Sequence, residues 1–457
     1  MEPPTTSAAD HLIAYLDAED PYDYRLHDVQ DLQLEAADAR LQEVRDQMAV
    51  LRRRAEDTGT DKVRALPDVV PLMFSDATYK SYPESFLTQG KWNALAAWLD
   101  ALSTSSGAAD IDMTGVQDID DWLARLRQHG HFVYVSSGTS GRCSILQVSD
   151  HDRQLDLADF QTVWRWKAGA KPDGNHPVFA LFPSAGSHRM VDTFGKIVEA
   201  FGRPDAMYYL SDQPLLVAEV NRLSRLNKSI AEGTASPSEI EAVQAENAAK
   251  QAGMAEVMAR LGEAVYRHRD EPSVFVGTWG AQLALAQAAK AAGLDAGVHP
   301  DSLFQVGGGL KGTTLPDDYR EQFQDILRLD ASRYVSLYGM TELTTFLPEC
   351  SSGRYHYPPW VIPLVLDKLG ESLAEPENGE LTGRLGFFDL SLEGHWGALV
   401  SGDHGTLRVE PCTCGRRSPS LRPDIVRFKD LPGGDDKVTC TGTIDTYVRG
   451  IVAGADQ

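Results

Sequence analysis

Apolar residues recur at alternating spacings of three and four between residues 28 and 56, with Glu, Asp and Arg filling the gaps. This period places the apolar side chains on one face, so the pattern predicts an amphipathic helix. The repeat is too short to predict a coiled coil. We expect the helix to pack onto the body of the protein, with binding to a partner helix as the alternative. The repeating positions are Leu34, Ala37, Leu41, Val44, Met48 and Leu51.

From about residue 131, short β-rich runs alternate with segments of helical periodicity. This alternation predicts an α/β fold in which layered, mostly parallel sheets are flanked by helices, and we expect the parallel sheet to be continuous. The expected strands lie near 131–135, 144–148, 177–182, 206–210, 273–277, 302–306 and 333–337. The expected helices start at about 150 and lie near 190–201, 279–292 and 316–328.

The pattern divides the chain into three parts. Residues 1–66 are expected to form a helical N-terminal extension, and residues 67–379 form the α/β core. Within the core, residues 221–270 are rich in Ala, Glu, Lys and Arg, which predicts an exposed helical insertion. Residues 380–457 predict a small antiparallel, β-rich subdomain. Its expected strands are Leu385–Leu390, Ala398–Ser401 and Thr406–Val409.

The charge balance restricts the class of partner. The chain has 43 Lys and Arg against 66 Asp and Glu, a formal charge of −23. Phosphate backbones and anionic lipids are repelled by this balance, so we expect no nucleic-acid and no membrane partner. The sequence shows neither a membrane span nor the basic-then-apolar order of a signal peptide, so we expect a cytoplasmic protein. Five cysteines are too few for a disulfide scaffold, so a cysteine cluster predicts metal binding or reactivity.

A loop of six Ser, Thr and Gly residues separates two β-rich runs. Backbone N–H groups of such a loop can turn toward one point, and its hydroxyls add donors for a phosphate. An ordinary polar hairpin explains the same composition, and the residues alone leave both interpretations open. A kinase-type P-loop fits this segment poorly, because no lysine follows and the next element is a strand. The loop consists of Ser136, Ser137, Gly138, Thr139, Ser140 and Gly141.

The loop and a second motif together resemble the ANL superfamily of adenylate-forming enzymes. The second motif, Tyr-Gly-x-Thr-Glu, follows the strand expected at 333–337. In the family its threonine hydroxyl contacts the α-phosphate of ATP, and its glutamate holds Mg²⁺, which prefers oxygen ligands. The resemblance implies these catalytic roles for Thr341 and Glu342. It adds Tyr338, Gly339 and Met340 to the ATP-binding residues.

Two further motifs extend the resemblance. Gly307, Gly308 and Gly309 follow an apolar strand and resemble the turn where adenine approaches the backbone, which requires glycine. Asp403 ends a Ser-Gly-Asp motif that resembles the family's Thr-Gly-Asp, whose acceptor-only carboxylate binds both ribose hydroxyls. The four motifs occur in family order. The resemblance covers about residues 70 to 442 and is nearest to the acyl-protein synthetases of bacterial bioluminescence and to phenylacetate-CoA ligases.

The resemblance implies ATP- and Mg²⁺-dependent activation of a carboxylic acid to an acyl-adenylate, with release of pyrophosphate. Transfer to a thiol of CoA or of a carrier or acceptor protein would follow. The alternatives are direct coupling to an amine, and a nucleotide-binding protein that has lost turnover. The resemblance also places His188 and Trp279 in the acid pocket, where Trp279 suggests a flat aromatic or polyketide-like acid. A surface position for His188 is the alternative.

A Cys3His set has the composition of a tetrahedral Zn²⁺ site. Cys350 and His356 lie in one segment, and Cys412 and Cys414 lie about sixty residues later. Since protein atoms would fill all four positions, the set predicts a structural rather than a catalytic zinc. Some phenylacetate-CoA-ligase-like proteins hold a structural metal in a similar arrangement. The alternative is that the first pair consists of incidental loop residues.

The C-terminal segment departs from the family pattern. Family members continue for about a hundred residues past a hinge motif resembling Asp435-Asp436-Lys437, into a small domain whose lysine assists adenylation. About twenty residues follow here, so we expect a truncated hinge and no full C-terminal domain, unless a separate chain supplies it. The phosphate loop also carries Cys143-Ser144 where the family often has Pro-Lys. Cys440 lies where the bioluminescence synthetases hold their acyl group, but an unreactive cysteine is the simpler interpretation.

Overall fold

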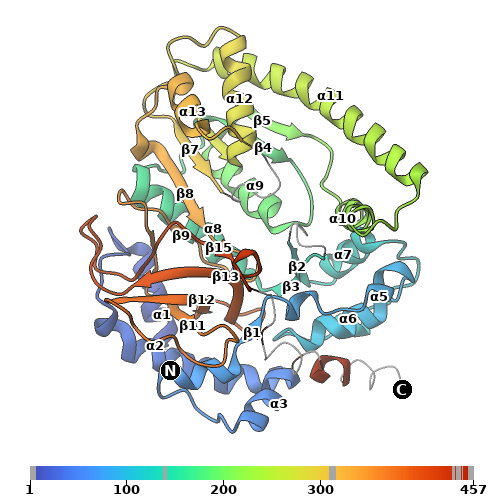
Figure 1. The fold of residues 1–457 in the computed structure, drawn as a ribbon, viewed down its shortest axis with the longest axis vertical. Coiled ribbons are helices and arrows are strands. Elements are labelled where there is room, and N and C mark those ends of the chain that lie inside the picture. The colour runs from blue at the N-terminus through green and yellow to red at the C-terminus, as the bar shows by residue number, and fades with distance from the viewer. Residues whose placement is uncertain are drawn as a thin grey trace, which may run out of the picture. The chain divides into compact units, whose positions relative to one another are not determined.

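The computed structural model describes residues 7–136, 142–307, 315–434, 438, 444 and 446–450, which form a mixed α/β fold (Figure 1). The chain divides into two compact units. The first unit comprises Met1–Val135, Ser144–Thr162 and Gly339–Gln457, and the second comprises Ser136–Cys143 and Val163–Tyr338. The second unit is therefore almost entirely one continuous segment of chain between two parts of the first.

A parallel sheet forms the centre of the second unit. Among the strands of this unit the order is β5 (Gly202–Ser211), β4 (His176–Pro183), β6 (Val274–Gly277), β7 (Leu303–Val306) and β8 (Tyr334–Tyr338). The expected continuous parallel sheet is confirmed for the strands between His176 and Tyr338, because each of the pairs β4–β5, β4–β6, β6–β7 and β7–β8 is parallel. The helices of this unit are α9 (Arg189–Phe201), α10 (Val217–Ala231), α11 (Pro237–Arg267), α12 (Trp279–Ala291) and α13 (Tyr319–Leu327), with a 3₁₀ turn η5 (Ala331–Arg333).

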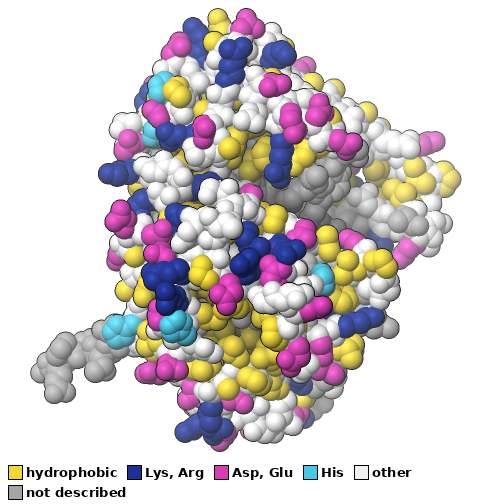
Figure 2. Space-filling view, turned by 60° about the vertical axis from the view of Figure 1, so that its left-hand side comes forward, with side chains coloured by type: hydrophobic (Ala, Val, Ile, Leu, Met, Phe, Trp, Pro, Cys, Tyr) yellow, Lys and Arg dark blue, Asp and Glu magenta, His cyan; other side chains and the backbone are white. Residues whose placement is uncertain are grey.

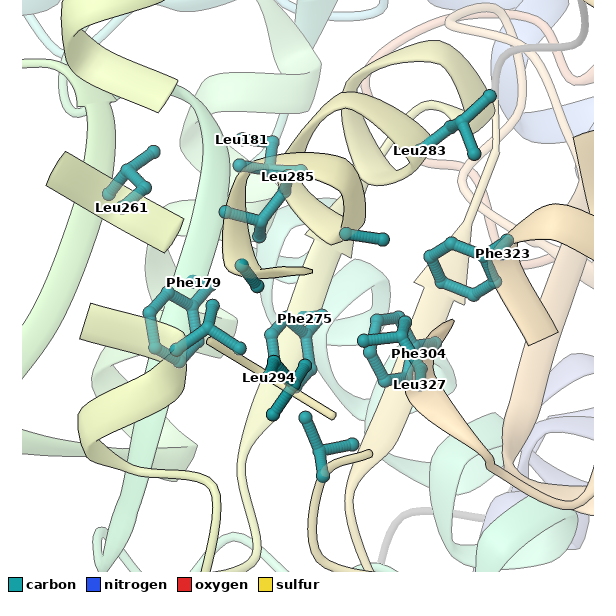
Figure 3. Close-up of a cluster of buried hydrophobic side chains, with 14 of the residues drawn as sticks. Phe179, Leu181, Leu261, Phe275, Leu283, Leu285, Leu294, Phe304, Phe323 and Leu327 are labelled. Atoms are coloured by element: carbon teal, nitrogen blue, oxygen red, sulfur yellow. The ribbon is translucent and has the colours of Figure 1, made fainter. Parts of the chain in front are cut away.

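The core of the second unit is built on a row of stacked rings (Figure 3). Phe179, Phe275 and Phe304 lie at matching positions of three neighbouring strands, with ring centroids 4.8 and 4.1 Å apart. Leucines of α11, α12 and α13 pack against the same buried cluster. Since burial of each such side chain is worth about 1.5–3 kcal/mol, this row fixes the register of the sheet.

The helices α10 and α11 occupy the segment expected to be a helical insertion. The first half of α11 is exposed on most sides, whereas its last turns are buried. There α11 approaches α12 so closely that a Cβ at Gly262 would lie 2.5 Å from the backbone carbon of Ala288. The segment therefore contributes part of the core of the second unit.

A mostly antiparallel sheet organises the first unit. Its order is β10 (Tyr355–His356), β14 (Ser420–Leu421), β13 (Ala398–Arg408), β12 (Glu380–Asp389) and β11 (Val361–Leu366). Two short strands, β1 (Phe74–Ser75) and β15 (Val426–Arg427), also pair with β13, β1 in parallel and β15 antiparallel. The prediction of two strands at 398–401 and 406–409 is wrong, because β13 is continuous through both. The remaining strands of this unit are β2 (Phe132–Val135), β3 (Ile145–Val148) and β9 (Leu347–Pro348), of which β2 and β3 pair as an antiparallel hairpin.

A bulge interrupts the pairing of β12 with β13. Arg384 pairs with His404 and Gly386 pairs with Val400, so the three residues Ser401 to Asp403 stand opposite Leu385 alone. A bulge redirects the side chains that it carries. The Ser-Gly-Asp motif therefore lies at an irregularity built into the sheet.

The N-terminal helices pack onto the body of the first unit, as expected. The apolar face of α2 (Leu26–Gln47) buries Leu41 and Val44 completely. The amide of Gln33 donates to the Pro359 carbonyl at 2.7 Å. The prediction of one helix over 28–56 is wrong, because Met48 is extended (φ −109°, ψ 104°) and a second helix, α3 (Ala49–Thr58), begins after it.

The remaining helices complete the list. The first unit also contains α1 (Ala8–Ile13), α4 (Leu66–Val69), α5 (Glu84–Thr88), α6 (Trp92–Ala101), α7 (Ile119–Gln128) and the 3₁₀ turns η1 (Ala14–Asp17), η2 (Val70–Leu72), η3 (Thr78–Lys80), η4 (Ala108–Asp110) and η6 (Phe428–Asp430). The helix α8 (Asp150–Ala168) begins in the first unit and ends in the second. None of the helices in the described ranges is long and apolar enough to cross a membrane.

Basic and acidic side chains lie beside one another on the face shown in Figure 2.

Candidate functional site

Glu342 is almost completely buried in the first unit, with 6% of its surface exposed. The hydroxyl of Ser144 donates a hydrogen bond to its carboxylate. The two ring nitrogens of His395 lie 3.3 Å from the carbonyl oxygen of Glu342 and 3.0 Å from that of Gln147. Both the carboxylate and the backbone of Glu342 are therefore fixed, and a buried carboxylate in such a place is suited to a cation.

Two buried carboxylates hold the loop that follows Glu342. Asp389, at the end of β12, accepts the backbone N–H groups of Thr344 and Thr345 at 3.0 and 3.1 Å. Asp159, on α8, accepts the N–H of Phe346 at 2.8 Å. Burial raises the pKa of Asp389, and hydrogen bonds from Ser391 and Thr345 offset part of this increase. The loop is therefore attached to two separate elements of the first unit.

Asp403 lies at the bulge of β13 and is paired with an arginine. Its carboxylate lies 3.3 Å from Nε of Arg427, which comes from the neighbouring strand β15. Its backbone N–H donates to the hydroxyl of Ser401 at 3.1 Å. The side chain of Asp403 is 15% exposed. The bulge therefore presents an oriented acceptor next to a cation.

Lys80 adds a positive charge near the carboxylates of Asp76 and Glu342. Nζ of Lys80 lies 3.1 Å from the carboxylate of Asp76, and the two side chains are 20% and 23% exposed. The hydroxyl of the neighbouring Tyr79 donates to the Trp396 carbonyl at 3.1 Å. Burial raises the pKa of Tyr79, and the negative charge of Glu342 raises it further.

Part of the predicted ATP-binding set lies outside the described residues. This applies to Ser137, Gly138, Thr139, Ser140 and Gly141, to Gly308 and Gly309, and also to Cys440 and the hinge-like motif. Ser136 follows β2 directly, and Gly307 follows β7 with its N–H donating to the Gly277 carbonyl at 3.4 Å. Tyr338 ends β8 in the second unit. Gly339, Met340 and Thr341 lead from it to Glu342 in the first unit.

His188 is buried in the second unit, directly before α9. Only 3% of its surface is exposed, and its ring nitrogens have no well-formed hydrogen bond to the described residues. Burial lowers the pKa of His188 to about 4, although the backbone of Leu215 offsets part of this decrease. The imidazole is therefore neutral near pH 7, and the alternative of a surface histidine is wrong.

Trp279 begins α12 and packs among aromatic side chains. Its ring lies 5.3 Å from that of Tyr319 and 5.6 Å from that of Phe323, both in edge-on geometry. The guanidinium of Arg320 lies over the indole at 5.2 Å. Much of the indole is therefore engaged with α13.

The Cys3His set meets in space in the first unit. The four ligand atoms of Cys350, His356, Cys412 and Cys414 lie within 4.8 Å of one another. Sγ of Cys350 lies 3.9 Å from Sγ of Cys412, and Sγ of Cys414 lies 3.4 Å from Nε2 of His356. Tetrahedral zinc with Zn–S bonds of about 2.3 Å separates two sulfurs by about 3.8 Å. The spacing of the donors therefore fits zinc.

Two similar turns carry the cysteines. The N–H of Cys350 donates to the Arg354 carbonyl and the N–H of Cys412 to that of Arg416, each at 2.8 Å. Each turn contains a glycine with positive φ, 72° at Gly353 and 96° at Gly415, a conformation that favours glycine. The two loops therefore present their thiols in the same way.

His356 is oriented and neutral. Its Nδ1 lies 2.8 Å from the hydroxyl of Ser418, which leaves Nε2 directed at the thiols. Burial, together with the charges of Arg416 and Arg354, lowers the pKa of His356 to about 3. A neutral imidazole with its second nitrogen hydrogen-bonded is the usual form of a histidine ligand.

The fold is similar to that of solved 2-hydroxyisobutyryl-CoA ligase. The open conformation of that enzyme, in complex with 2-HIB-AMP and CoA, matches with a TM-score of 0.52 at 14% sequence identity, over 91% of this chain and 74% of that chain. The same ligase in the thioesterification state matches with a TM-score of 0.53 at 16% identity, over 90% and 72% of the two chains. No protein-family model and no curated protein matches by sequence. The comparison therefore shows that this chain shares the overall fold of that ligase.

Proposed function

We propose that the chain activates a carboxylic acid with ATP, forming an acyl-adenylate and releasing pyrophosphate. The carrying observation is the buried carboxylate of Glu342, oriented by Ser144 and His395 in a fold shared with a ligase solved with 2-HIB-AMP. Burial of an ionised carboxylate costs free energy because the group loses its contact with water, and binding of a cation during function would offset this cost. Magnesium held by Glu342 would neutralise charge on the phosphates of ATP.

The remaining motifs supply the contacts to ATP. Thr341 would contact the α-phosphate, and Asp403 would accept the ribose hydroxyls at the bulge of β13. The loop 136–141 would bind the phosphates, and the turn 307–309 would approach the adenine. The substrate carboxylate, already ionised at neutral pH, attacks the α-phosphate in line, so no general base is required.

The acid would bind in the second unit. The neutral, buried imidazole of His188 can donate one hydrogen bond and accept another without introducing a charge. Trp279 would contribute an aromatic wall to the same pocket. Burial lowers the pKa of His188, and few polar groups surround its ring. This supports a role for His188 in binding, because residues with strongly shifted pKa values are common at functional sites.

A thiol is the proposed acceptor of the acyl group. The structural neighbour was solved with CoA, and the motifs resemble those of synthetases and ligases that use protein or CoA thiols. A carrier or acceptor protein is therefore an alternative to CoA within the same chemistry.

Exchange of labelled pyrophosphate into ATP across a panel of aryl and fatty acids tests adenylation. At least one acid should support exchange, and Glu342→Gln should reduce its rate on the order of 100-fold. Glu377→Gln, on the exposed loop before β12, is the matched control and should exchange at the wild-type rate. ATP binding without exchange for any acid would favour a nucleotide-binding protein. Products formed with CoA, hydroxylamine and amines would separate thioester from amide formation.

We also propose a structural Zn²⁺ held by Cys350, His356, Cys412 and Cys414. The separation of the donors and the hydrogen bond on Nδ1 of His356 support this assignment. Metal analysis of the purified protein should find one zinc per chain, and Cys412→Ser should remove most of it. Cys143→Ser, which changes a buried cysteine outside the set, should retain the metal. A wild-type protein with clearly less than one zinc per chain would refute the assignment.

A further inference from the structure

Lys80 is a partly buried cation at the end of the 3₁₀ turn η3. Its ammonium group is bonded to Asp76, four residues earlier, at 3.1 Å. Burial lowers the pKa of Lys80, but the charges of Glu342 and Asp76 outweigh burial and raise the pKa above its ordinary value. The group is therefore charged at neutral pH, and the nearby carboxylates offset the cost of holding it out of water.

The segment that carries Lys80 is attached to the strand of the Ser-Gly-Asp motif. In β1, Phe74 and Ser75 pair in parallel with Leu399 and Val400. The N–H of Asp76 then donates to the Val400 carbonyl at 3.1 Å. The next residues of that strand form the bulge that ends at Asp403. Backbone hydrogen bonds therefore hold residues 74–76 next to the bulge.

The same segment is also attached to the backbone that carries Glu342. The ring of Tyr79 lies 5.3 Å from that of His395, in edge-on geometry. Its hydroxyl donates to the carbonyl of Trp396, the residue after His395. His395 in turn contacts the Glu342 carbonyl at 3.3 Å. Lys80 therefore follows a residue that packs directly on the support of Glu342.

We propose that Lys80 binds the phosphate groups of the nucleotide. It would bring a cation from the N-terminal part of the chain to the site that contains Glu342 and Asp403. This rests on the proposed function. Three carboxylates, at Asp76, Glu342 and Asp403, lie in this region, so a polyphosphate requires cations here in addition to a metal. Arg427 is committed to Asp403. A lysine ammonium has three donors on a flexible stem, so it can keep one bond to Asp76 and direct another to a phosphate.

Binding of MgATP and of AMP to the whole protein, measured by calorimetry, tests the proposal. Lys80→Met should weaken MgATP binding about 10- to 100-fold, which corresponds to loss of one charge-assisted hydrogen bond. AMP binding should change less than about 3-fold, because AMP lacks the two terminal phosphates. Lys80→Arg should restore part of the MgATP affinity. Lys91→Met, an exposed lysine before α6, is the control and should bind both nucleotides as the wild type does.

A structural role for Lys80 predicts a different result. If the lysine only neutralises Asp76 and Glu342, Lys80→Met should weaken MgATP and AMP binding equally, together with a loss of thermal stability. Asp76→Asn keeps the cation, so its MgATP affinity relative to AMP should stay near that of the wild type even where stability falls. Equal loss for both nucleotides, or no loss, overturns the assignment of Lys80. A wild-type protein that binds no MgATP overturns the proposed function as well.

Discussion

Replacement of Asp389 tests how strongly the loop after Glu342 is held. The buried carboxylate accepts the N–H groups of Thr344, Thr345 and Ser391, and also the hydroxyl of Ser391. Asp389→Ala leaves three backbone donors without this acceptor, and each unsatisfied buried donor costs about 1–3 kcal/mol. Relief of the desolvated charge and entry of water reduce the total. We expect Asp389→Ala to lower the free energy of unfolding by at least about 3 kcal/mol.

Asp389→Asn should cost less, about 1–3 kcal/mol. Its amide oxygen can still accept from Thr344 and Thr345, but its NH₂ group then faces the N–H of Ser391. Asp367→Ala is the control, because Asp367 accepts comparable bonds from Glu371 and Ser372 in an exposed loop. Water can replace that acceptor, so this control should lose less than about 1 kcal/mol.

Urea unfolding followed by tryptophan fluorescence measures the difference. With a slope of about 3 kcal/mol per molar urea, a loss of 3 kcal/mol lowers the midpoint by about 1 M. The order of stabilities should be wild type, Asp367→Ala, Asp389→Asn and then Asp389→Ala. An Asp389→Ala protein that unfolds within about 0.3 M of the wild type would refute the reasoning that these bonds hold the loop.

Three further predictions concern stability. His188 has a pKa of about 4 in the folded protein, below its unfolded value, so its contribution is present above about pH 6.5 and is lost as the pH falls toward 4. Between pH 6.5 and 4 the free energy of unfolding, measured with urea, should fall by up to roughly 3 kcal/mol less in His188→Gln than in the wild type. The control His27→Gln, at an exposed position, should follow the wild type. Equal pH dependence in His188→Gln and the wild type would contradict the assignment. Gly262→Ala should destabilise the protein by about 1–3 kcal/mol, because the added methyl group would clash with α12. Gly253→Ala, in the same helix but with open space around it, should stabilise by up to about 1 kcal/mol. Thermal unfolding that ranks the two variants the other way would contradict the close approach of the helices. Arg222→Ala removes an exposed network with two glutamates and should cost less than about 1 kcal/mol, an effect that shrinks further at 1 M salt.

Much of the parallel sheet could be predicted because β4, β6 and β7 are buried on both faces. The apolar runs of β4, β6, β7 and β8 differ from the expected bounds by at most one residue at either end. The break at Met48 could not be predicted, because no Gly or Pro marks it. Met48 is completely buried, so packing rather than local propensity decides the break. The continuity of β13 was missed for a related reason, since the residues Ser401 to Asp403 form a bulge inside the strand rather than a break between two strands.

The candidate site was predicted only where a motif is local. Glu342 and Asp403 lie in short recognisable motifs, and the Cys3His set was indicated by residue type. Lys80, Ser144 and His395 were missed because long-range packing relates them to Glu342. An Asp followed four residues later by a Lys is common on any helical turn, so Asp76 and Lys80 gave no signal of their own.

The position of the second unit within the chain bears on how the protein is made. Leu72 accepts a hydrogen bond from Trp396, 324 residues later. At a synthesis rate of about 5–20 residues per second, a new N-terminal segment waits roughly 15 to 65 seconds for that partner. The second unit, nearly one continuous segment, can form the parallel strands β4 to β8 on the ribosome during this interval. The part of α2 that contacts Pro359 through Gln33 meanwhile lacks this partner. Nascent chains stalled near residue 340 should therefore be the species most dependent on chaperones.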